Sequence, residues 1–150
     1  MVCVKMEIVN IPFVKKSDDI KTPAYAHKGD AGLDLFIPVS TRVPAGKQVF
    51  VDSGIAFALP DGYAWSVRPK SGLAKDYELT ITNTPGTIDS QYRNWVGVLL
   101  KNNGRHGIAF SKDEKFAQLV LEKIPKANLI EVKSLDDTER GQGGFGSTGR

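Results

Sequence analysis

The sequence predicts an all-β domain, a jelly-roll-like barrel or sandwich with one short helix. Short segments of apolar or alternating residues recur along the chain, which is typical of strands. Turn sequences such as Pro60-Asp61-Gly62 and Asn102-Asn103-Gly104 separate them, and these residue types favour the φ angles of chain reversals. Many strands joined by closely spaced turns favour a sandwich or jelly roll.

Eight segments are expected to be strands because their apolar residues alternate or run together. In chain order they span residues 4–11, 33–37, 48–58, 63–67, 79–82, 95–100, 117–124 and 127–132. Residues 71–77 form the one helix-compatible stretch, where Ser71 is expected to act as the N-cap. Alternation predicts a core that includes Val49, Val51, Ile55, Phe57, Trp65, Val67, Val96, Val98, Leu100, Leu119 and Leu121.

The composition is that of one globular domain. The chain has 150 residues, of which 41% are hydrophobic and 25% charged. A net charge of +3 with scattered basic residues does not indicate direct nucleic-acid binding, but it allows a small anionic ligand.

The cysteine count and the hydropathy of the chain predict the cellular compartment of the protein. Cys3 is the only cysteine, which excludes an intrachain disulfide and favours a reducing environment; a small buried side chain is its expected role. No apolar run approaches the roughly 20 residues of a membrane span, and the N-terminus lacks the apolar stretch of a signal peptide. We expect an intracellular protein, cytoplasmic, or nuclear if its source is eukaryotic or viral.

Residues 140–150 are rich in glycine and carry groups suited to a phosphorylated ring. Their glycines let backbone N–H groups approach an anion, and Arg140, Ser147 and Thr148 can donate hydrogen bonds to phosphate oxygens. Phe145 offers a flat face to a base. Taken alone, the same segment is equally compatible with a disordered terminus.

Five short motifs stand out from the strand pattern. They are Ala-Gly-Leu-Asp-Leu at 31–35, Arg-Pro-Lys-Ser-Gly-Leu-Ala at 68–74, Gly-Thr-Ile-Asp-Ser-Gln-Tyr-Arg at 86–93, Phe-Ala-Gln-Leu at 116–119 and Arg-Gly-Gln-Gly-Gly-Phe-Gly-Ser-Thr-Gly at 140–149. Each motif alone is weak evidence. In this order and spacing they resemble the motifs of the trimeric dUTP pyrophosphatase (dUTPase) family across almost the whole chain.

The resemblance implies Mg²⁺-dependent hydrolysis of dUTP to dUMP and pyrophosphate, which limits uracil in DNA and supplies dUMP for dTTP synthesis. It also implies a homotrimer with active sites shared between subunits. Residues 1–139 would form the β domain, and residues 140–150 a flexible lid belonging to the same domain.

Asp89 is the expected catalytic residue. Hydrolysis of a phosphoanhydride needs a base that takes a proton from the attacking water. By resemblance, Asp89 activates a water for attack on the α-phosphorus; without the other motifs, an Asx turn would be the preferred interpretation of this residue. Tyr92 would pack under the deoxyribose and reject a ribose hydroxyl, and a half-buried strand aromatic is compatible with that role.

The other implied roles concern uracil, phosphate and metal. Residues 83–86 would form a hairpin that reads uracil through main-chain groups and excludes the methyl of thymine. Asp34 would hold a water of a Mg²⁺ coordinated by the triphosphate. The substrate-binding residues implied by the resemblance are Arg68, Lys70, Ser71, Gly72, Asn83, Gly86, Thr87, Ile88, Tyr92, Gln118, Arg140, Phe145, Gly146, Ser147 and Thr148.

The chain departs from the family pattern at three places. Lys70 replaces the usual arginine and loses its two-pronged donor, for which Arg68 either compensates or is simply a surface charge. Asp113-Glu114-Lys115 replaces Gly-Asp-Arg, which puts the local turn geometry in doubt. Asn94 replaces a glycine and is expected to keep that turn by tolerating positive φ.

Two rival functions are weighed against this one. A dCTP deaminase needs a glutamate on the strand after the hairpin, and residues 95–100 carry no charge. A non-catalytic nucleotide-binding module would have little reason to retain a base, a phosphate-binding motif and a lid together.

Overall fold

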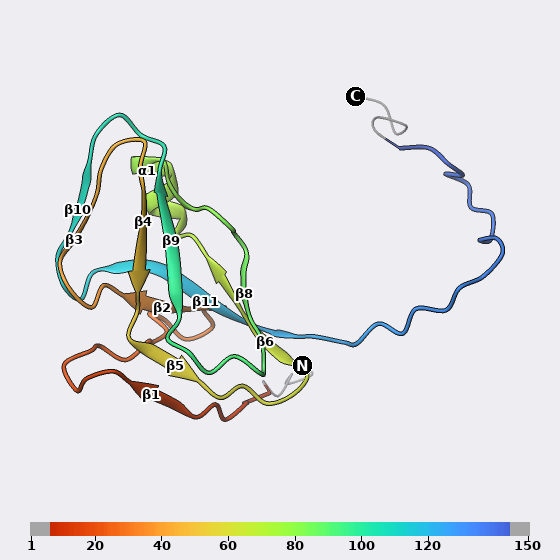
Figure 1. The fold of residues 1–150 in the computed structure, drawn as a ribbon, viewed down its shortest axis with the longest axis horizontal. Helices are drawn as coiled ribbons and strands as arrows, with labels where there is room; N and C mark the ends of the chain where they lie inside the picture. The colour runs from red at the N-terminus through yellow and green to blue at the C-terminus, as the bar shows by residue number, and fades with distance from the viewer. Residues whose placement is uncertain (1–6, 145–150) are drawn as a thin grey trace.

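The computed structural model describes residues 7–144, and short strands dominate it (Figure 1). The strands are β1 (Phe13–Lys15), β2 (Gly32–Phe36), β3 (Thr41–Val43), β4 (Gln48–Asp52), β5 (Ile55–Phe57), β6 (Tyr63–Arg68), β7 (Leu79–Ile81), β8 (Gly86–Ile88), β9 (Gly97–Asn102), β10 (Ile108–Phe110) and β11 (Lys115–Lys123). Helix α1 (Ser71–Tyr77) is the one helix of the described chain. The all-β prediction with one short helix is therefore confirmed.

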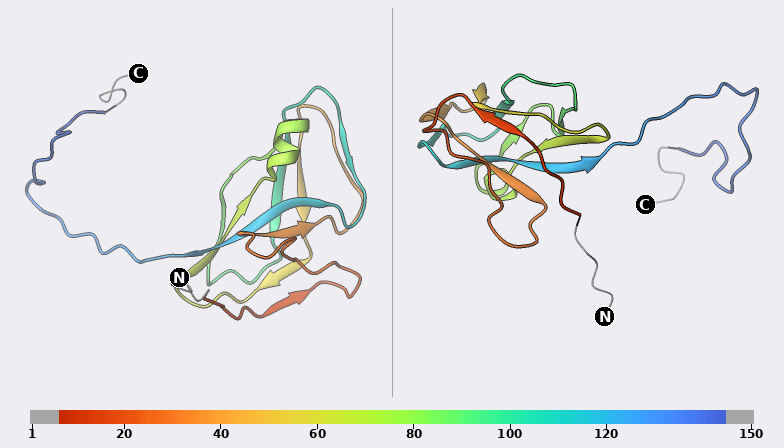
Figure 2. Two further views of the ribbon diagram at one scale, coloured as in Figure 1. Left: turned by 180° about the vertical axis from the view of Figure 1, so that it is seen from behind. Right: turned by 90° about the horizontal axis from the view of Figure 1, so that it is seen from below.

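Two antiparallel sheets form the body of the molecule. One has the strand order β2-β11-β6-β8 and the other the order β4-β9-β7. Strand β1 pairs with β5 and strand β10 with β3, each as a two-stranded sheet (Figure 2). This arrangement is consistent with a sandwich of the jelly-roll kind.

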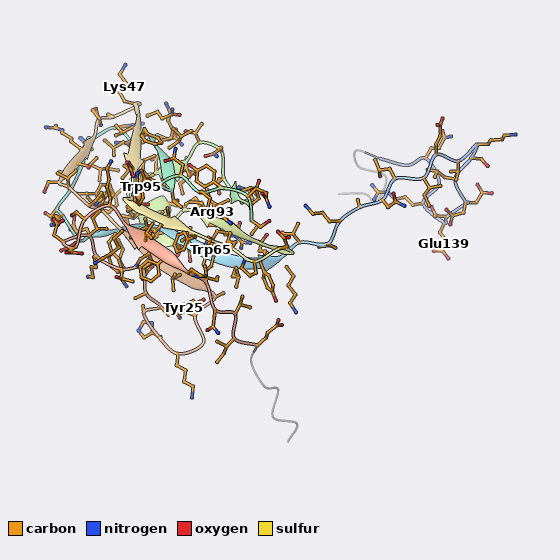
Figure 3. The ribbon with its side chains drawn as sticks, turned by 60° about the horizontal axis from the view of Figure 1, so that its bottom comes forward. Tyr25, Lys47, Trp65, Arg93, Trp95 and Glu139 are labelled. Atoms are coloured by element: carbon orange, nitrogen blue, oxygen red, sulfur yellow. The ribbon has the colours of Figure 1, made fainter. Side chains whose placement is uncertain are left out.

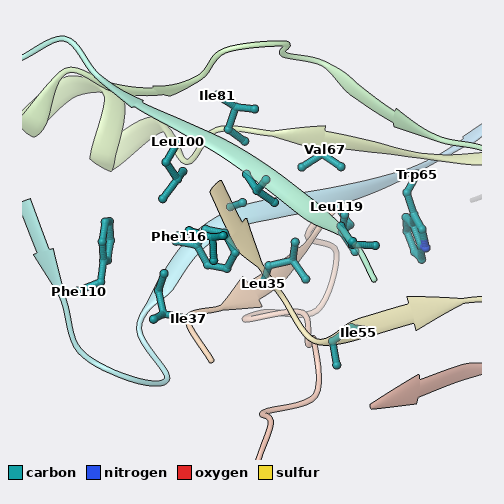
Figure 4. Close-up of a cluster of buried hydrophobic side chains, with 14 of the residues drawn as sticks. Leu35, Ile37, Ile55, Trp65, Val67, Ile81, Leu100, Phe110, Phe116 and Leu119 are labelled. Atoms are coloured by element: carbon teal, nitrogen blue, oxygen red, sulfur yellow. The ribbon is translucent and has the colours of Figure 1, made fainter. Parts of the chain in front are cut away.

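The core lies between the facing sheets (Figure 4). Leu35, Val67 and Leu119 fill it from the four-stranded sheet, and Val98 and Leu100 from β9. Burying each such side chain stabilises the fold by about 1.5–3 kcal/mol. Of the predicted core residues, Val49 and Leu121 are only partly buried and pack against the cluster, and the others are buried.

Helix α1 has the predicted bounds but not the predicted cap. Lys70 is the N-cap, with extended backbone angles and no capping hydrogen bond from its side chain, and Ser71 is the first helical residue. The prediction that Ser71 caps the helix is wrong, because the chain stays extended through Lys70, whose ammonium pairs with Asp34 instead.

Three of the predicted strand segments, 48–58, 4–11 and 127–132, differ from the structure. Segment 48–58 divides into β4 and β5 because Gly54 has a φ of 68° and its N–H donates to Asp52 Oδ1 at 2.8 Å. Residues 7–11 form no strand, and residues 4–6 of that predicted segment, like Cys3, lie outside the described part.

Residues 127–132 are also not a strand. Beyond β11 the chain leaves the body as a long arm (Figures 1 and 2). Side chains of the arm such as Glu139 lie well away from Trp65 and Trp95 of the body (Figure 3). Within residues 7–144, no helix has the length and apolar character that a membrane span requires.

Candidate active site

Three strands place a row of polar side chains on the outer face of the four-stranded sheet. Gln118 on β11 lies opposite Asp34 on β2 and opposite Arg68 on β6. Directly opposed residues of antiparallel strands point to the same face. The neighbouring Leu119 and Val67 point to the core, so the alternation that builds the core also presents this row.

A cavity of about 400 Å³ lies beside this row. It unites four predicted site residues from three motifs, Asp34, Lys70, Ser71 and Gln118. The rest of its lining is formed by Ala26, His27, Asp30, Ala31, Gly32 and Lys115. The sequence predicts no site role for these six residues, and Lys115 stands out in it only as part of a departure from the family pattern.

Asp34 is the electrostatic centre of the cavity. Its side chain is buried, and its Oδ1 accepts a hydrogen bond from Lys70 Nζ while its Oδ2 lies 2.8 Å from Lys115 Nζ. Burial alone would raise the pKa of Asp34, but the hydrogen bonds from Lys115 and Lys70 outweigh it and hold the pKa below its usual value. The carboxylate is therefore charged at neutral pH.

This pairing predicts a loss of stability in acid. The pKa of Asp34 is lower in the folded protein than its unfolded value of about 3.9, so the unfolded chain binds the proton more readily. The stabilisation is present above the unfolded value and is lost as pH falls through the folded pKa. In urea unfolding with EDTA, Asp34→Asn should show a shallower fall of the unfolding free energy below about pH 4 than the unmodified protein. Parallel pH profiles would show that Asp34 contributes nothing.

Gln118 fixes the start of α1. Its Nε2 donates to the Pro69 carbonyl at 2.9 Å, and it lies so close over Gly32 that a Cβ there would come within 2.1 Å of Gln118 Oε1. At Gly72 an added Cβ would meet no described atom within 4 Å. The Lys70-Ser71-Gly72 turn is thus held from the sheet side and open on the other.

Arg68 is turned away from the cavity. Its guanidinium donates to Ser66 Oγ at 3.1 Å and pairs with Glu122, and it is not among the residues that line the cavity. Compensation for Lys70 by Arg68 stays a prediction.

Residues 83–86 form a turn that leads into β8, but the predicted hairpin is wrong, because β7 pairs with β9 and β8 with β6 in different sheets. Thr84 N–H donates to the Ile81 carbonyl at 3.1 Å and closes the turn. A Cβ at Gly86 would lie 3.3 Å from both Asn83 Nδ2 and Val67 Cβ, so only glycine fits there without movement of its neighbours. Thr87 is exposed and lies opposite Ser66, whereas Ile88 is half-buried opposite Trp65.

Asp89 follows this strand and is exposed. Its Oδ1 accepts a hydrogen bond from Gln91 N–H at 3.0 Å, so the Asx turn weighed from the sequence is present. Tyr92 is half-buried; its N–H donates to the Asp89 carbonyl at 3.2 Å and its hydroxyl to the Trp95 carbonyl at 2.9 Å. The loop therefore fixes the orientation of both side chains.

Within one chain these two groups of residues are separate. Asp89 and Tyr92 do not line the cavity of Asp34. Because β8 pairs Gly86 with Val67 and Ile88 with Trp65, the chain approaches Asp89 at the end of β6 remote from Arg68. Arg140 lies on the arm, where its Nε donates to the Gly143 carbonyl at 2.8 Å. Phe145, Gly146, Ser147 and Thr148 lie outside the described residues.

Two departures from the family pattern have different outcomes. Asp113 has a φ of 68°, so it adopts in the turn before β11 the left-handed conformation that glycine adopts readily. The expectation of positive φ at Asn94 is wrong. That loop is held instead by Arg93 Nη1, which donates to the carbonyls of Ser90 at 2.6 Å and Tyr92 at 3.0 Å.

Comparison with known proteins shows the family to which the chain belongs. A model of the family described as dUTPase matches residues 18–149. The chain is 44% identical over 140 residues to a deoxyuridine 5'-triphosphate nucleotidohydrolase of Clostridioides difficile, covering 93% of this chain and 98% of the relative. It is 44% identical over 133 residues to the protein of that name from Clostridium tetani, covering 89% and 92%.

Solved structures show the same fold. The dUTPase of Staphylococcus bacteriophage 80alpha with dUpNHpp superposes with a TM-score of 0.86 at 25% identity, covering 94% of this chain and 99% of that chain. A mutant dUTPase from phage phi11 of S. aureus, described as coordinating a structural Mg(II) ion, gives a TM-score of 0.77 at 23% identity, covering 84% and 98%. Together with the family match over most of its length, these likenesses show that the chain belongs to the dUTPase family.

Proposed function

We propose that this protein hydrolyses dUTP to dUMP and pyrophosphate, with Asp89 activating the attacking water. The observation that carries the proposal is the cavity that gathers Asp34, Lys70, Ser71 and Gln118 from three separate motifs in a member of the dUTPase family. Limiting uracil in DNA and supplying dUMP for dTTP synthesis would follow from this activity.

The cavity is proposed to hold the triphosphate. Ser71 supplies a hydroxyl and Gly72 a backbone N–H on the open side of the turn, and Lys70 supplies positive charge. Gln118 lies next to them, and its amide N–H donates a hydrogen bond to the Pro69 carbonyl.

Asp34 is proposed to contact Mg²⁺ through water. In the described chain no three His, Cys, Asp or Glu side chains gather as a metal site, so an ion in this cavity would be held mainly by phosphate oxygens and reached by Asp34 through water. When bound, Mg²⁺ would neutralise negative charge on the phosphates during water attack.

The segment that contains β8 and the turn before it is proposed to bind the nucleoside. Asn83, Gly86, Thr87 and Ile88 belong to the segment that would read uracil through main-chain groups, and the packing of Gly86 against Asn83 and Val67 holds this backbone in place. Tyr92 would then pack under the deoxyribose, in an orientation that its hydrogen bond to Trp95 supports.

Tyr92→Ala is expected to weaken discrimination against the ribose sugar. Removing the ring removes the surface that a 2'-hydroxyl would strike, so the ratio of kcat/KM for UTP to that for dUTP should rise about tenfold or more, which is on the order of 1.4 kcal/mol. Tyr92→Phe keeps the ring and is the control. An unchanged ratio in Tyr92→Ala, or comparable UTP and dUTP rates in the unmodified protein, would contradict the role of Tyr92.

A homotrimer with shared sites is part of the proposal. Asp89 and the Asp34 cavity lie apart in one copy, so a site that uses both is more readily completed between copies. The arm supports contact between copies. Its Leu129 is 93% exposed and its Ile130 is 76% exposed, and such apolar side chains are more stable when another copy covers them.

The body offers a groove that suits such an arm. A cavity of about 620 Å³ is lined mainly by apolar side chains that include Ile11, Phe13, Tyr25 and Leu121. Trp65 also lines it, and the buried indole N–H of Trp65 has no hydrogen-bond acceptor among the described residues. Residues 140–148 of the same arm would then close over a neighbouring site.

Turnover of a nucleotide panel tests the proposed function. Pyrophosphate release should be fast with dUTP and poor with UTP, dTTP, dCTP and the other common nucleoside triphosphates. Ammonia release from dCTP would instead indicate a deaminase, although β9 carries no carboxylate. Nucleotide binding without any turnover would favour the binding module.

A further inference from the structure

Two lysines share the Asp34 carboxylate, one on each oxygen. Lys70 Nζ donates to Oδ1, and Lys115 Nζ lies 2.8 Å from Oδ2. The Asp34 side chain is 5% exposed, whereas those of Lys70 and Lys115 are 27% and 44% exposed. The carboxylate is therefore nearly enclosed, while both ammonium groups keep access to the cavity.

The two lysines differ in how the fold holds them. Lys70 is the N-cap of α1 and directly precedes Ser71, so it belongs to the turn proposed to bind phosphate. Lys115 is the first residue of β11 and pairs with Phe36 of β2, the strand that carries Asp34. Lys115 is thus anchored to the same pair of strands as the carboxylate it contacts.

An irregularity in β11 aims Lys115 at Asp34. Strict alternation from Ala117 and Leu119, both buried, would turn the side chain at 115 toward the core. The register instead shifts between Lys115 and Ala117, and Phe116 and Ala117 are both buried in succession. Bulges of this kind re-aim side chains beside functional sites. Here the extra residue brings Lys115 out to the face that carries Asp34.

We propose that Lys115 is a positioning residue that holds the Asp34 carboxylate in place when Lys70 leaves it for the triphosphate. The inference rests on the proposed function. A triphosphate entering the cavity attracts the Lys70 ammonium away from Asp34. Without Lys115, the nearly enclosed carboxylate would then face the phosphates with no cation beside it, which is unfavourable for a buried charge. Lys115 thus makes Asp34 available to a water of the metal.

Measuring the affinity for dUpNHpp by calorimetry tests whether Lys115 positions Asp34 while Lys70 binds the triphosphate. Lys115→Gln should weaken binding in Mg²⁺ at least tenfold and reduce the gain that Mg²⁺ gives over EDTA, while dUMP binding stays within twofold. Lys115→Arg restores the charge and should bind within about threefold of the unmodified protein. Lys112→Gln is the matched control, because it removes a nearby ammonium that pairs with Asp19 outside the cavity.

A double-mutant cycle separates positioning from direct phosphate binding. If Lys115 acts through Asp34, Lys115→Gln should have little further effect on dUpNHpp binding in Mg²⁺ once Asp34→Asn is present. Fully additive losses would overturn the proposal, as would Mg²⁺-dependent binding by Lys115→Gln within twofold of normal, or an equal loss of dUMP binding. These outcomes concern binding, so a failure of the unmodified protein to hydrolyse dUTP would be seen separately.

Discussion

Asp89→Asn should abolish dUTP hydrolysis and leave nucleotide binding largely intact. Asparagine has the same shape and can still accept the hydrogen bond from Gln91 N–H, so the loop geometry should persist. It cannot take the proton of the attacking water, and loss of a general base costs about 10²–10⁴-fold in rate. Pyrophosphate release should fall by at least that factor, while the Kd for dUpNHpp changes by less than about threefold.

The matched control for Asp89 is a carboxylate in the turn before β6 that contacts the loop of Asp89. Asp61 accepts a hydrogen bond from Ser90 Oγ at 2.8 Å and has no proposed contact with substrate. Asp61→Asn should retain nearly full activity. If Asp89→Asn kept more than a tenth of the normal rate, Asp89 would not be the base.

Removal of residues 140–150 should leave a folded core with severely reduced activity. The described arm is exposed and adds nothing to the hydrophobic core, so the melting temperature should change little. Ordering a glycine-rich segment costs about 1–2 kcal/mol per residue, which contacts from Arg140, Phe145, Ser147 and Thr148 would offset only when nucleotide is bound. Losing a charged hydrogen bond and a stacked aromatic should lower kcat/KM about a hundredfold or more.

Truncation at Gly149 is the control, because it removes only Arg150 and keeps every proposed contact. A protein ending at Glu139 with undiminished activity would return the tail to the status of a disordered terminus.

Complementation tests whether the arm acts on a neighbouring copy. Asp89→Asn chains keep their arms, and truncated chains keep Asp89, so neither should be active alone. Trimers refolded from both chains should recover part of the activity if a site takes its base and its arm from different copies. Mixed trimers without activity would place the arm on its own subunit.

Much of the fold could be predicted because its longer elements carry clear local signals. Strand β6 has core residues at alternating positions, Trp65 and Val67, and follows the turn sequence Pro60-Asp61-Gly62. Helix α1 follows Pro69 and has the predicted bounds. Strands β1, β3, β8 and β10 have three residues each, too few for alternation to distinguish them from loops. The break between β4 and β5 depends on the backbone of Gly54, a single-residue signal inside an otherwise continuous apolar segment.

The candidate site shows the same division. The sequence motifs predict Asp34, Lys70, Ser71 and Gln118 as site residues. The fold brings these four residues into one cavity. Lys115 could not be found in this way, because alternation along β11 predicts the wrong face for it and only the bulge reverses that prediction. The position of a side chain in a site can thus depend on a β-bulge, which alternation along the sequence does not reveal.

Hydrolysis of dUTP in water enriched in oxygen-18 is the most direct test of the mechanism. If water attacks the α-phosphorus, its oxygen must end on dUMP. Mass spectrometry should find one labelled oxygen in the phosphate of dUMP and none in pyrophosphate, and Asp89→Asn should form both products at least about a hundredfold more slowly. Label in pyrophosphate, or release of orthophosphate in its place, would contradict the account.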